Sequence, residues 1–84
     1  MRELLSVEVA IIIAYNLRKA RKKANLTQAQ VAQKAEIDRV TYCRHENGKS
    51  IMSIQSLVKI ANALNVTVDD LLFGVFEAMQ EENE

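Results

Sequence analysis

The most constraining feature of this chain is the stretch 26–48, in which helix-start and helix-stop residues alternate. Thr27 and Gln30 form a capping pair, because side chains of these types three residues apart can satisfy the exposed amides at a helix start. Asp38 can cap another helix, and Asn47 followed by glycine can end it. These signals predict two short helices joined by a tight turn: 28–35 and 39–46.

The inward side of this stretch is small and apolar. Val31, Ala32 and Ala35 give the first of the two helices a narrow face for burial, and Ile37 is placed to fill the turn. A helix as short as 39–46 has little stability of its own. We therefore expect neighbouring helices to hold it by packing.

A longer helix is predicted ahead of this stretch. Ser6 is the expected N-cap, the helix runs to about Ala24, and Asn25 takes the left-handed position at its end. Its core face is expected to hold four residues at helical spacing: Ile13, Leu17, Ala20 and Ala24. Ile11 and Tyr15 lie off that face, and they are either a second buried stripe or scattered surface residues.

Two further helices are predicted after the stretch. Ser53 can cap the fourth, whose apolar residues recur every three or four positions: Ile54, Leu57, Val58, Ile60, Ala61 and Leu64. Thr67 and Asp70 make another capping pair, which opens a fifth helix. With no proline and only two glycines, the chain is predicted to be all-α. The pattern leaves open whether Gly74 breaks the last helix.

Length bounds the organisation of the chain. Its 84 residues make one domain, 1–84, large enough for a single helical core and too small for a separate ligand-sensing domain. The single cysteine cannot form an internal disulfide, and the apolar run 9–14 is too short to span a bilayer. We expect a cytoplasmic protein with no membrane contact, no metal, no cofactor and no small-molecule ligand.

Charge is unevenly distributed along the chain, although the formal net charge is zero. Residues 1–50 carry ten Lys and Arg against five Asp and Glu, whereas residues 51–84 carry one against six. A basic first half can dock on phosphates despite the neutral sum. A solvated surface with no ligand is the alternative that composition alone allows.

Taken together, these residues resemble the XRE family of small bacterial and phage regulators, the type of Cro and the lambdoid repressors. The resemblance covers about residues 13–72 and rests on the following elements: Arg21, Leu26-Thr27-Gln28, Ala32, Glu46-Asn47-Gly48, and the run from Leu57 to Leu72. It implies a compact five-helix, lambda-repressor-like domain with a helix-turn-helix. It also implies a sequence-specific DNA-binding transcription regulator, a dimeric repressor that reads a palindromic operator through the major groove.

The resemblance further assigns roles on and around the helix 39–46. The residues implied to read base edges are Arg39, Val40, Cys43 and Arg44. Arginine suits guanine because its planar fork matches O6 and N7, and valine can touch a thymine methyl. The residues implied to contact the DNA backbone are Gln28, Thr41, Asn47 and Lys49.

Arg21 and Glu46 are implied to meet between the first and third helices and to orient the reading helix. The contribution of such a pair to stability can be near zero if the pair is exposed. We therefore expect Glu46→Ala to weaken DNA binding more than it lowers folding stability.

Three residues depart from the pattern of the family. Glu36 stands where glycine usually makes the turn, and a left-handed conformation there costs about 1 kcal/mol for another residue. Tyr42 and His45 occupy core-facing positions that are normally aliphatic. A tyrosine can pack there if its hydroxyl finds a partner. His45 is expected to be a half-buried histidine with a hydrogen-bond partner, rather than a pH switch or a metal ligand.

The sequence argues against an enzyme. Cys43 and His45 are two residues apart on a helix, which places them on nearly opposite sides and prevents nucleophile activation or joint metal binding. The chain contains none of the HExxH, CxxC, P-loop or GxSxG patterns.

A protein-interaction module is the second function that the sequence supports, for example an antitoxin with autoregulatory DNA binding. Apolar residues gather in the N-terminal extension 1–12 and in the C-terminal segment 73–84. These two segments could instead form a homodimer interface, and a homodimer is expected. A restriction-modification controller is a more specific alternative, suggested by the run Ile37-Asp38-Arg39.

Overall fold

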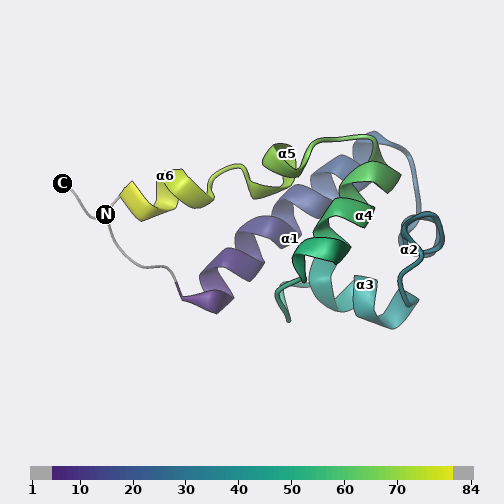
Figure 1. Ribbon diagram of the computed structural model, residues 1–84, viewed down its shortest axis with the longest axis horizontal. Coiled ribbons are helices and arrows are strands. Elements are labelled where there is room, and N and C mark those ends of the chain that lie inside the picture. Colours follow the sequence, from purple (N-terminus) through teal and green to yellow (C-terminus); the bar gives the residue numbers. More distant parts are fainter. Residues whose placement is uncertain (1–4, 81–84) are drawn as a thin grey trace.

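The computed structural model describes residues 5–80, and all the regular structure in that range is helical (Figure 1). The long helix α1 packs against α3 and α5, and α2 packs against α3 and α4. The last helix, α6, lies at the opposite end of the molecule from α2 (Figure 1). The helices are α1 (Ser6–Lys23), α2 (Gln28–Ala35), α3 (Arg39–Glu46), α4 (Ile54–Leu64), α5 (Val68–Leu72) and α6 (Val75–Gln80). The all-α prediction is confirmed, with one short helix more than the five expected.

Local capping decides where most helices begin. The side chain of Thr27 accepts a hydrogen bond from the Gln30 amide, and that of Asp38 accepts one from the Thr41 amide. Ser53 and Thr67 cap α4 and α5 in the same way. Ser6 is the exception and the predicted cap is wrong. Ser6 is already the first residue of α1, and the amide of the preceding Leu5 donates to the Glu8 carboxylate at 2.8 Å.

Left-handed residues end several of these helices. Asn25, Glu36 and Asn65 have φ angles of 60°, 57° and 58°, and Gly48 has a φ angle of 72°. Asparagine tolerates this conformation better than most residues, which suits it to the ends of α1 and α4. Glu36 therefore adopts the left-handed conformation of the family's turn, although it stands where glycine is usual.

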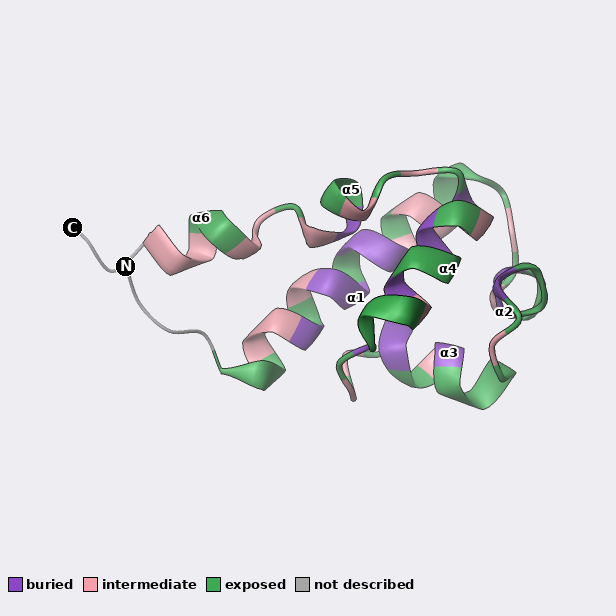
Figure 2. Cartoon of the chain, in the orientation of Figure 1, coloured by how far each residue is buried: buried purple, intermediate pink, exposed green. Residues whose placement is uncertain are grey.

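The core lies between α1, α2, α4 and α5, and the buried surfaces face inward along these helices (Figure 2). It includes most residues predicted from helical spacing, together with Tyr42 and Met52. Three residues of the predicted faces are exposed: Ala24, Ile54 and Val58. Ile54 is 80% exposed because it begins α4 on the outer side of that helix. Ile11 and Tyr15 are also exposed, which excludes a second buried stripe.

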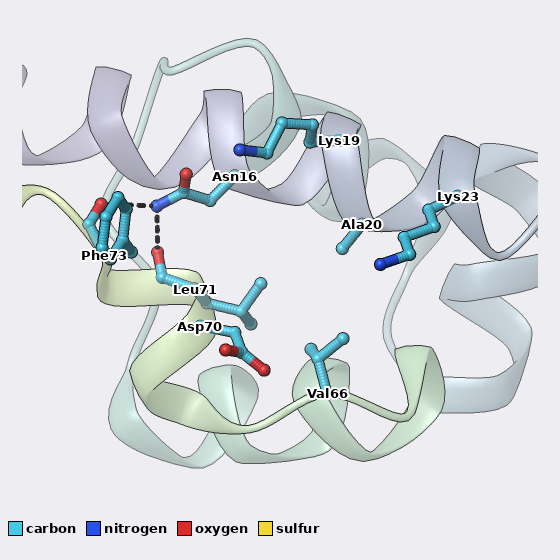
Figure 3. A pocket seen from close by; sticks show the side chains of 8 residues that line it. All are labelled: Asn16, Lys19, Ala20, Lys23, Val66, Asp70, Leu71 and Phe73. Atoms are coloured by element: carbon cyan, nitrogen blue, oxygen red, sulfur yellow. Dashed lines mark hydrogen bonds between the residues drawn. The ribbon is translucent and has the colours of Figure 1, made fainter.

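The fifth helix ends before Gly74. That glycine has a φ angle of 97°, a conformation that side chains rarely adopt, and α6 begins immediately after it. Asn16 on α1 is buried and holds this junction, because its side-chain amide donates to the carbonyls of Leu71 at 2.8 Å and Phe73 at 2.9 Å (Figure 3). No residue of α6 is itself buried.

Within residues 5–80, no helix has the length and hydropathy needed to cross a membrane. The terminal segments that the sequence analysis assigned to dimerisation reach beyond this range at 1–4 and 81–84.

Candidate nucleic-acid interface

A tight turn joins α2 to α3. The amide of Ile37 donates to the Ala32 carbonyl at 2.9 Å, and that of Glu36 donates to the Gln33 carbonyl at 3.1 Å. These bonds close the end of α2 while the left-handed Glu36 redirects the chain into α3. Ile37 packs against the core as predicted. The turn is therefore built by backbone hydrogen bonds and one apolar plug, and it does not require glycine.

A buried carboxylate joins three helices behind this turn. Glu46 is 1% exposed, and its two oxygens accept four hydrogen bonds. Arg21 on α1 donates from both Nε and Nη2 at 2.8 Å. Gln28 on α2 donates from Nε2 at 2.9 Å, and the Tyr42 hydroxyl on α3 donates at 2.7 Å. The predicted contact between Arg21 and Glu46 is thus present, within a larger network that fixes α3 relative to α1 and α2.

The burial of this carboxylate changes its energetics. Burial alone would raise the pKa of Glu46, but hydrogen bonds from Arg21, Gln28 and Tyr42 outweigh it and lower the pKa below the usual 4.5. The carboxylate is therefore ionised in the folded protein at neutral pH. The sequence analysis allowed for an exposed pair of near-zero contribution to stability. That condition does not hold, because the carboxylate is buried and fully hydrogen-bonded.

The two unusual core-facing residues of α3 both find polar partners. Tyr42 is fully buried, and burial together with its hydrogen bond to Glu46 raises the pKa of its hydroxyl. His45 is also buried, and its Nδ1 lies 3.0 Å from the Ser50 hydroxyl. This confirms the interpretation of His45 as a buried histidine with a hydrogen-bond partner.

The burial of His45 predicts a pH dependence of stability. Burial lowers the pKa of His45 below 6.5. A hydrogen bond from the ring to the Ser50 backbone opposes this shift because it favours the protonated ring, and the Arg44 cation lowers the pKa further. As pH falls below 6.5 the unfolded chain takes up a proton before the folded one does, so the free energy of unfolding decreases. His45 can change the free energy of unfolding by at most about 1.4 kcal/mol per pH unit. Urea titrations at a series of pH values check this expectation. His45→Gln should flatten the curve between pH 7 and 5, and an unchanged slope would contradict it.

Side chains proposed to read bases stand on the outer face of α3. Arg39, Val40 and Arg44 are exposed, and so is the neighbouring Thr41. Val40 is 67% exposed, so its methyl groups are available for contact with an apolar group outside the protein. The surface of α3 is thus free to enter a groove.

Cys43 differs from the other three residues predicted to read bases. It is half-buried, and its Sγ donates a hydrogen bond to Oε1 of Gln28 at 3.2 Å. The thiol hydrogen of Cys43 is therefore donated to Gln28, in a hydrogen bond that joins α3 to α2. Spacing on a helix could not reveal this contact, because the partner lies on another helix.

Three of the four residues predicted to contact the DNA backbone lie at the ends of the motif, and the fourth, Thr41, lies between them on α3. Gln28 is half-buried at the start of α2, and its amide is held by Glu46 and Cys43. Asn47 and Lys49 are exposed in the segment that follows α3. Arg18 on α1 was not predicted from the sequence as part of this site, and its Nη1 donates to the backbone carbonyl of Glu46 at 2.6 Å. Its position one turn before Arg21 was the available signal.

Comparison with known proteins places this arrangement in a family. A family model described as helix-turn-helix, HTH_3, matches residues 17–71. The cryptic phage CTXphi transcriptional repressor RstR of Vibrio cholerae is 39% identical over 59 residues, which are 70% of this chain and 53% of RstR. The control protein C.MunI of a Mycoplasma species is 35% identical over 69 residues, 81% of this chain and 93% of C.MunI.

A solved structure agrees with these matches. The restriction-modification controller protein C.AhdI from Aeromonas hydrophila superposes with a TM-score of 0.72 at 26% identity, covering 74% of this chain and 94% of C.AhdI. The chain thus spans about half the length of RstR but nearly all of the two controller-type proteins. On the match of the family model and the helices that it covers, this chain belongs to the HTH_3 family of XRE-type helix-turn-helix proteins.

Proposed function

We propose that this protein is a sequence-specific DNA-binding transcription regulator that acts as a repressor. The observation that carries the proposal is the exposed outer face of α3, with Arg39, Val40 and Arg44 free, on a helix fixed from behind by the buried Glu46 network. A rigidly held helix with free guanidinium groups suits readout of base edges in the major groove. The similarity to RstR, a transcriptional repressor, and to C.MunI, a control protein, supports the same function.

In this proposal the two ends of the motif anchor it to the phosphates. Gln28, at the N-terminus of α2, lies where backbone amides and the helix dipole favour an anion. Asn47 and Lys49 flank the other end of α3, and Thr41 lies on α3 between these anchors. Such contacts position the helix without reading sequence, whereas Arg39 and Arg44 discriminate between base pairs. The protein would work in the cytoplasm, on double-stranded DNA.

We further infer a homodimer that binds a palindromic operator. Leu5, Val7, Phe73 and Phe76 are exposed large apolar residues at the start of α1 and around α6. Asn16 fixes the junction from which α6 leaves, so α6 can present its apolar side in a defined direction. Two-fold pairing would place two copies of α3 in successive major grooves, about one helical turn apart.

Selection of binding sites from random duplex DNA tests the function directly. The full chain is expected to recover a palindrome, and the spacing of its half-sites reports the separation of the two α3 helices. A recovered pool with no sequence preference would contradict the proposal. Transcription from a reporter that carries the selected site, with and without the protein, then tests repression.

The roles on α3 and on the following segment predict different mutant behaviour. Arg39→Ala is expected to relax preference at one base step and to cost about 1–3 kcal/mol of discrimination. Lys49→Ala is expected to lower the affinity for all DNA sequences by a similar factor. It should also reduce the steepness of log affinity against log salt by about one. Titrations of the selected duplex and of single-base variants, at several salt concentrations, separate the two. Loss of base preference in Lys49→Ala would reverse the assignment.

A control protein of a restriction-modification system is a narrower candidate within the same function. It is favoured by the similarity to the restriction-modification controller protein C.AhdI, of which the superposition covers 94%. The test is whether the selected operator lies upstream of genes for a nuclease and a methyltransferase. An operator beside unrelated genes would reject this narrower role and leave the repressor proposal in place.

A further inference from the structure

The C-terminal end of α3 is closed by a compact set of backbone bonds. The Lys49 amide donates to the Arg44 carbonyl at 2.9 Å, and the Gly48 amide donates to the His45 carbonyl at 3.2 Å. Gly48 supplies the left-handed residue that this capping motif requires. The motif satisfies the carbonyls of Arg44 and His45 but does not include the carbonyl of Glu46, the last residue of the helix.

Arg18 supplies the bond that this motif does not provide. Its Nη1 donates to the Glu46 carbonyl at 2.6 Å, from a half-buried position on α1. A cation at this point also interacts favourably with the negative end of the α3 dipole. Ile11, two turns earlier on α1, lies beside Gly48. A Cβ atom added to Gly48 would lie 3.5 Å from Cγ1 of Ile11. One face of α1 thus supports the point at which α3 becomes the segment 47–49.

Arg18 and Arg21 hold the same residue in different ways. Arg21 pairs with the Glu46 carboxylate, which also binds α2 and Tyr42, so it fixes the orientation of α3. Arg18 binds the main-chain carbonyl of Glu46, which belongs to the peptide that joins Glu46 to Asn47. Its influence therefore falls on the backbone of the segment that carries Asn47 and Lys49.

We propose that Arg18 is a positioning residue for the phosphate-contacting segment Asn47–Lys49 and that it acts on DNA through the Glu46 carbonyl. The inference rests on the proposed function, since it assigns these residues to phosphates. A fixed segment binds phosphate without first losing conformational freedom, so loosening it weakens binding even though Asn47 and Lys49 remain.

Arg18→Met tests this role, because it keeps an unbranched apolar stem and removes the donor. Affinity for the duplex that the wild type selects and for random-sequence duplex should both fall about tenfold, the effect of one charge-assisted hydrogen bond. A plot of log affinity against log salt concentration should become shallower, by about 0.9 in slope for each phosphate that the variant no longer neutralises. Arg18→Lys should recover part of the affinity, since its ammonium can reach the carbonyl with a single donor. Lys59→Met removes an exposed charge from α4 and is the matched control.

A double mutant separates positioning from direct contact. If Arg18 acts through the segment 47–49, Lys49→Ala should cost less in the Arg18→Met background than in the wild type. Additive losses, or full affinity and slope in Arg18→Lys, would show that Arg18 contacts phosphate itself, which overturns the inference.

Hydrogen exchange without DNA keeps the inference testable if the proposed function fails. Arg18→Met should accelerate exchange of the Gly48 and Lys49 amides by about tenfold while protection in the core of α4 is unchanged. Unchanged exchange at both amides would overturn the positioning role. If Arg18→Met accelerates exchange as expected but the wild type selects no DNA sequence, the positioning role stands and the proposed function is rejected.

Discussion

Glu46→Ala is expected to lower the free energy of unfolding by about 3–5 kcal/mol, the cost of breaking a buried charged pair. The mutation leaves the Arg21 guanidinium without its carboxylate and removes the acceptor of the Tyr42 hydroxyl and of the Gln28 amide. Domains of this kind have a total stability of about 5–15 kcal/mol, so the loss is a large fraction. Urea denaturation followed by circular dichroism measures it. The sequence analysis expected a larger effect on DNA binding than on stability, and the burial of Glu46 predicts a large effect on both.

Glu77→Ala is the matched control, because it removes an exposed glutamate from α6. Its free energy of unfolding should stay within about 0.5 kcal/mol of the wild type. Operator affinity of Glu46→Ala must be measured where the variant remains folded, for example at low temperature. A loss of stability no greater than that of Glu77→Ala would show that the network does not stabilise the fold.

Phe76→Glu is expected to weaken operator binding by about 10²–10⁴-fold, because it should break the proposed dimer. A loss of this size equals the gain in affinity that two linked binding modules usually have over one. Phe76 is 58% exposed in the single chain, so a charge there should leave the fold of the monomer intact. In the proposed dimer the same charge would be buried against the partner without compensation. Light scattering on the purified variant should report the monomer mass, and gel-shift titration of the palindrome should report the loss of affinity.

Ile54→Glu provides the informative comparison. Ile54 belongs to a second exposed apolar surface, on α4 and the segment before it, together with Ile51 and Val58. A dimer that survives Phe76→Glu and dissociates in Ile54→Glu would move the interface from α6 to that surface. A chain that ends after Leu72 extends the test, and a persistent dimer there would exclude the segment 73–84 as the main contact.

The positions of the helices were predictable because their signals are local. Thr27 with Gln30, and Thr67 with Asp70, cap helices through bonds between residues three apart. Apolar spacing likewise found most of the core. Spacing failed at Ala24, Ile54 and Val58 because a periodic pattern gives a helix an apolar side but does not say how much of that side a neighbour covers.

The candidate site was only partly accessible from the sequence. Similarity to a family supplied Arg21 and Glu46, and their contact is present. Two of the partners that surround them were not predicted, because Gln28 and Arg18 reach Glu46 only once three helices have packed. Tyr42 lies four residues before Glu46 on the same helix, so its contact is local, although the sequence analysis left the partner of its hydroxyl unnamed. Cys43 illustrates the same limit, since its place on α3 suggested base readout while its thiol bonds to α2.

The sequence by itself determined the all-α fold, the limits of α2 and α3, and the left-handed turn at Glu36. All of these depend on interactions within a few residues. Only the tertiary structure decided the burial of Glu46, the hold of Arg18 on the end of α3, and the bonds of Asn16 that direct α6. These hydrogen bonds join residues 28 and 55 positions apart. Their geometry follows from how α1 packs against α3 and α5, which no local pattern encodes.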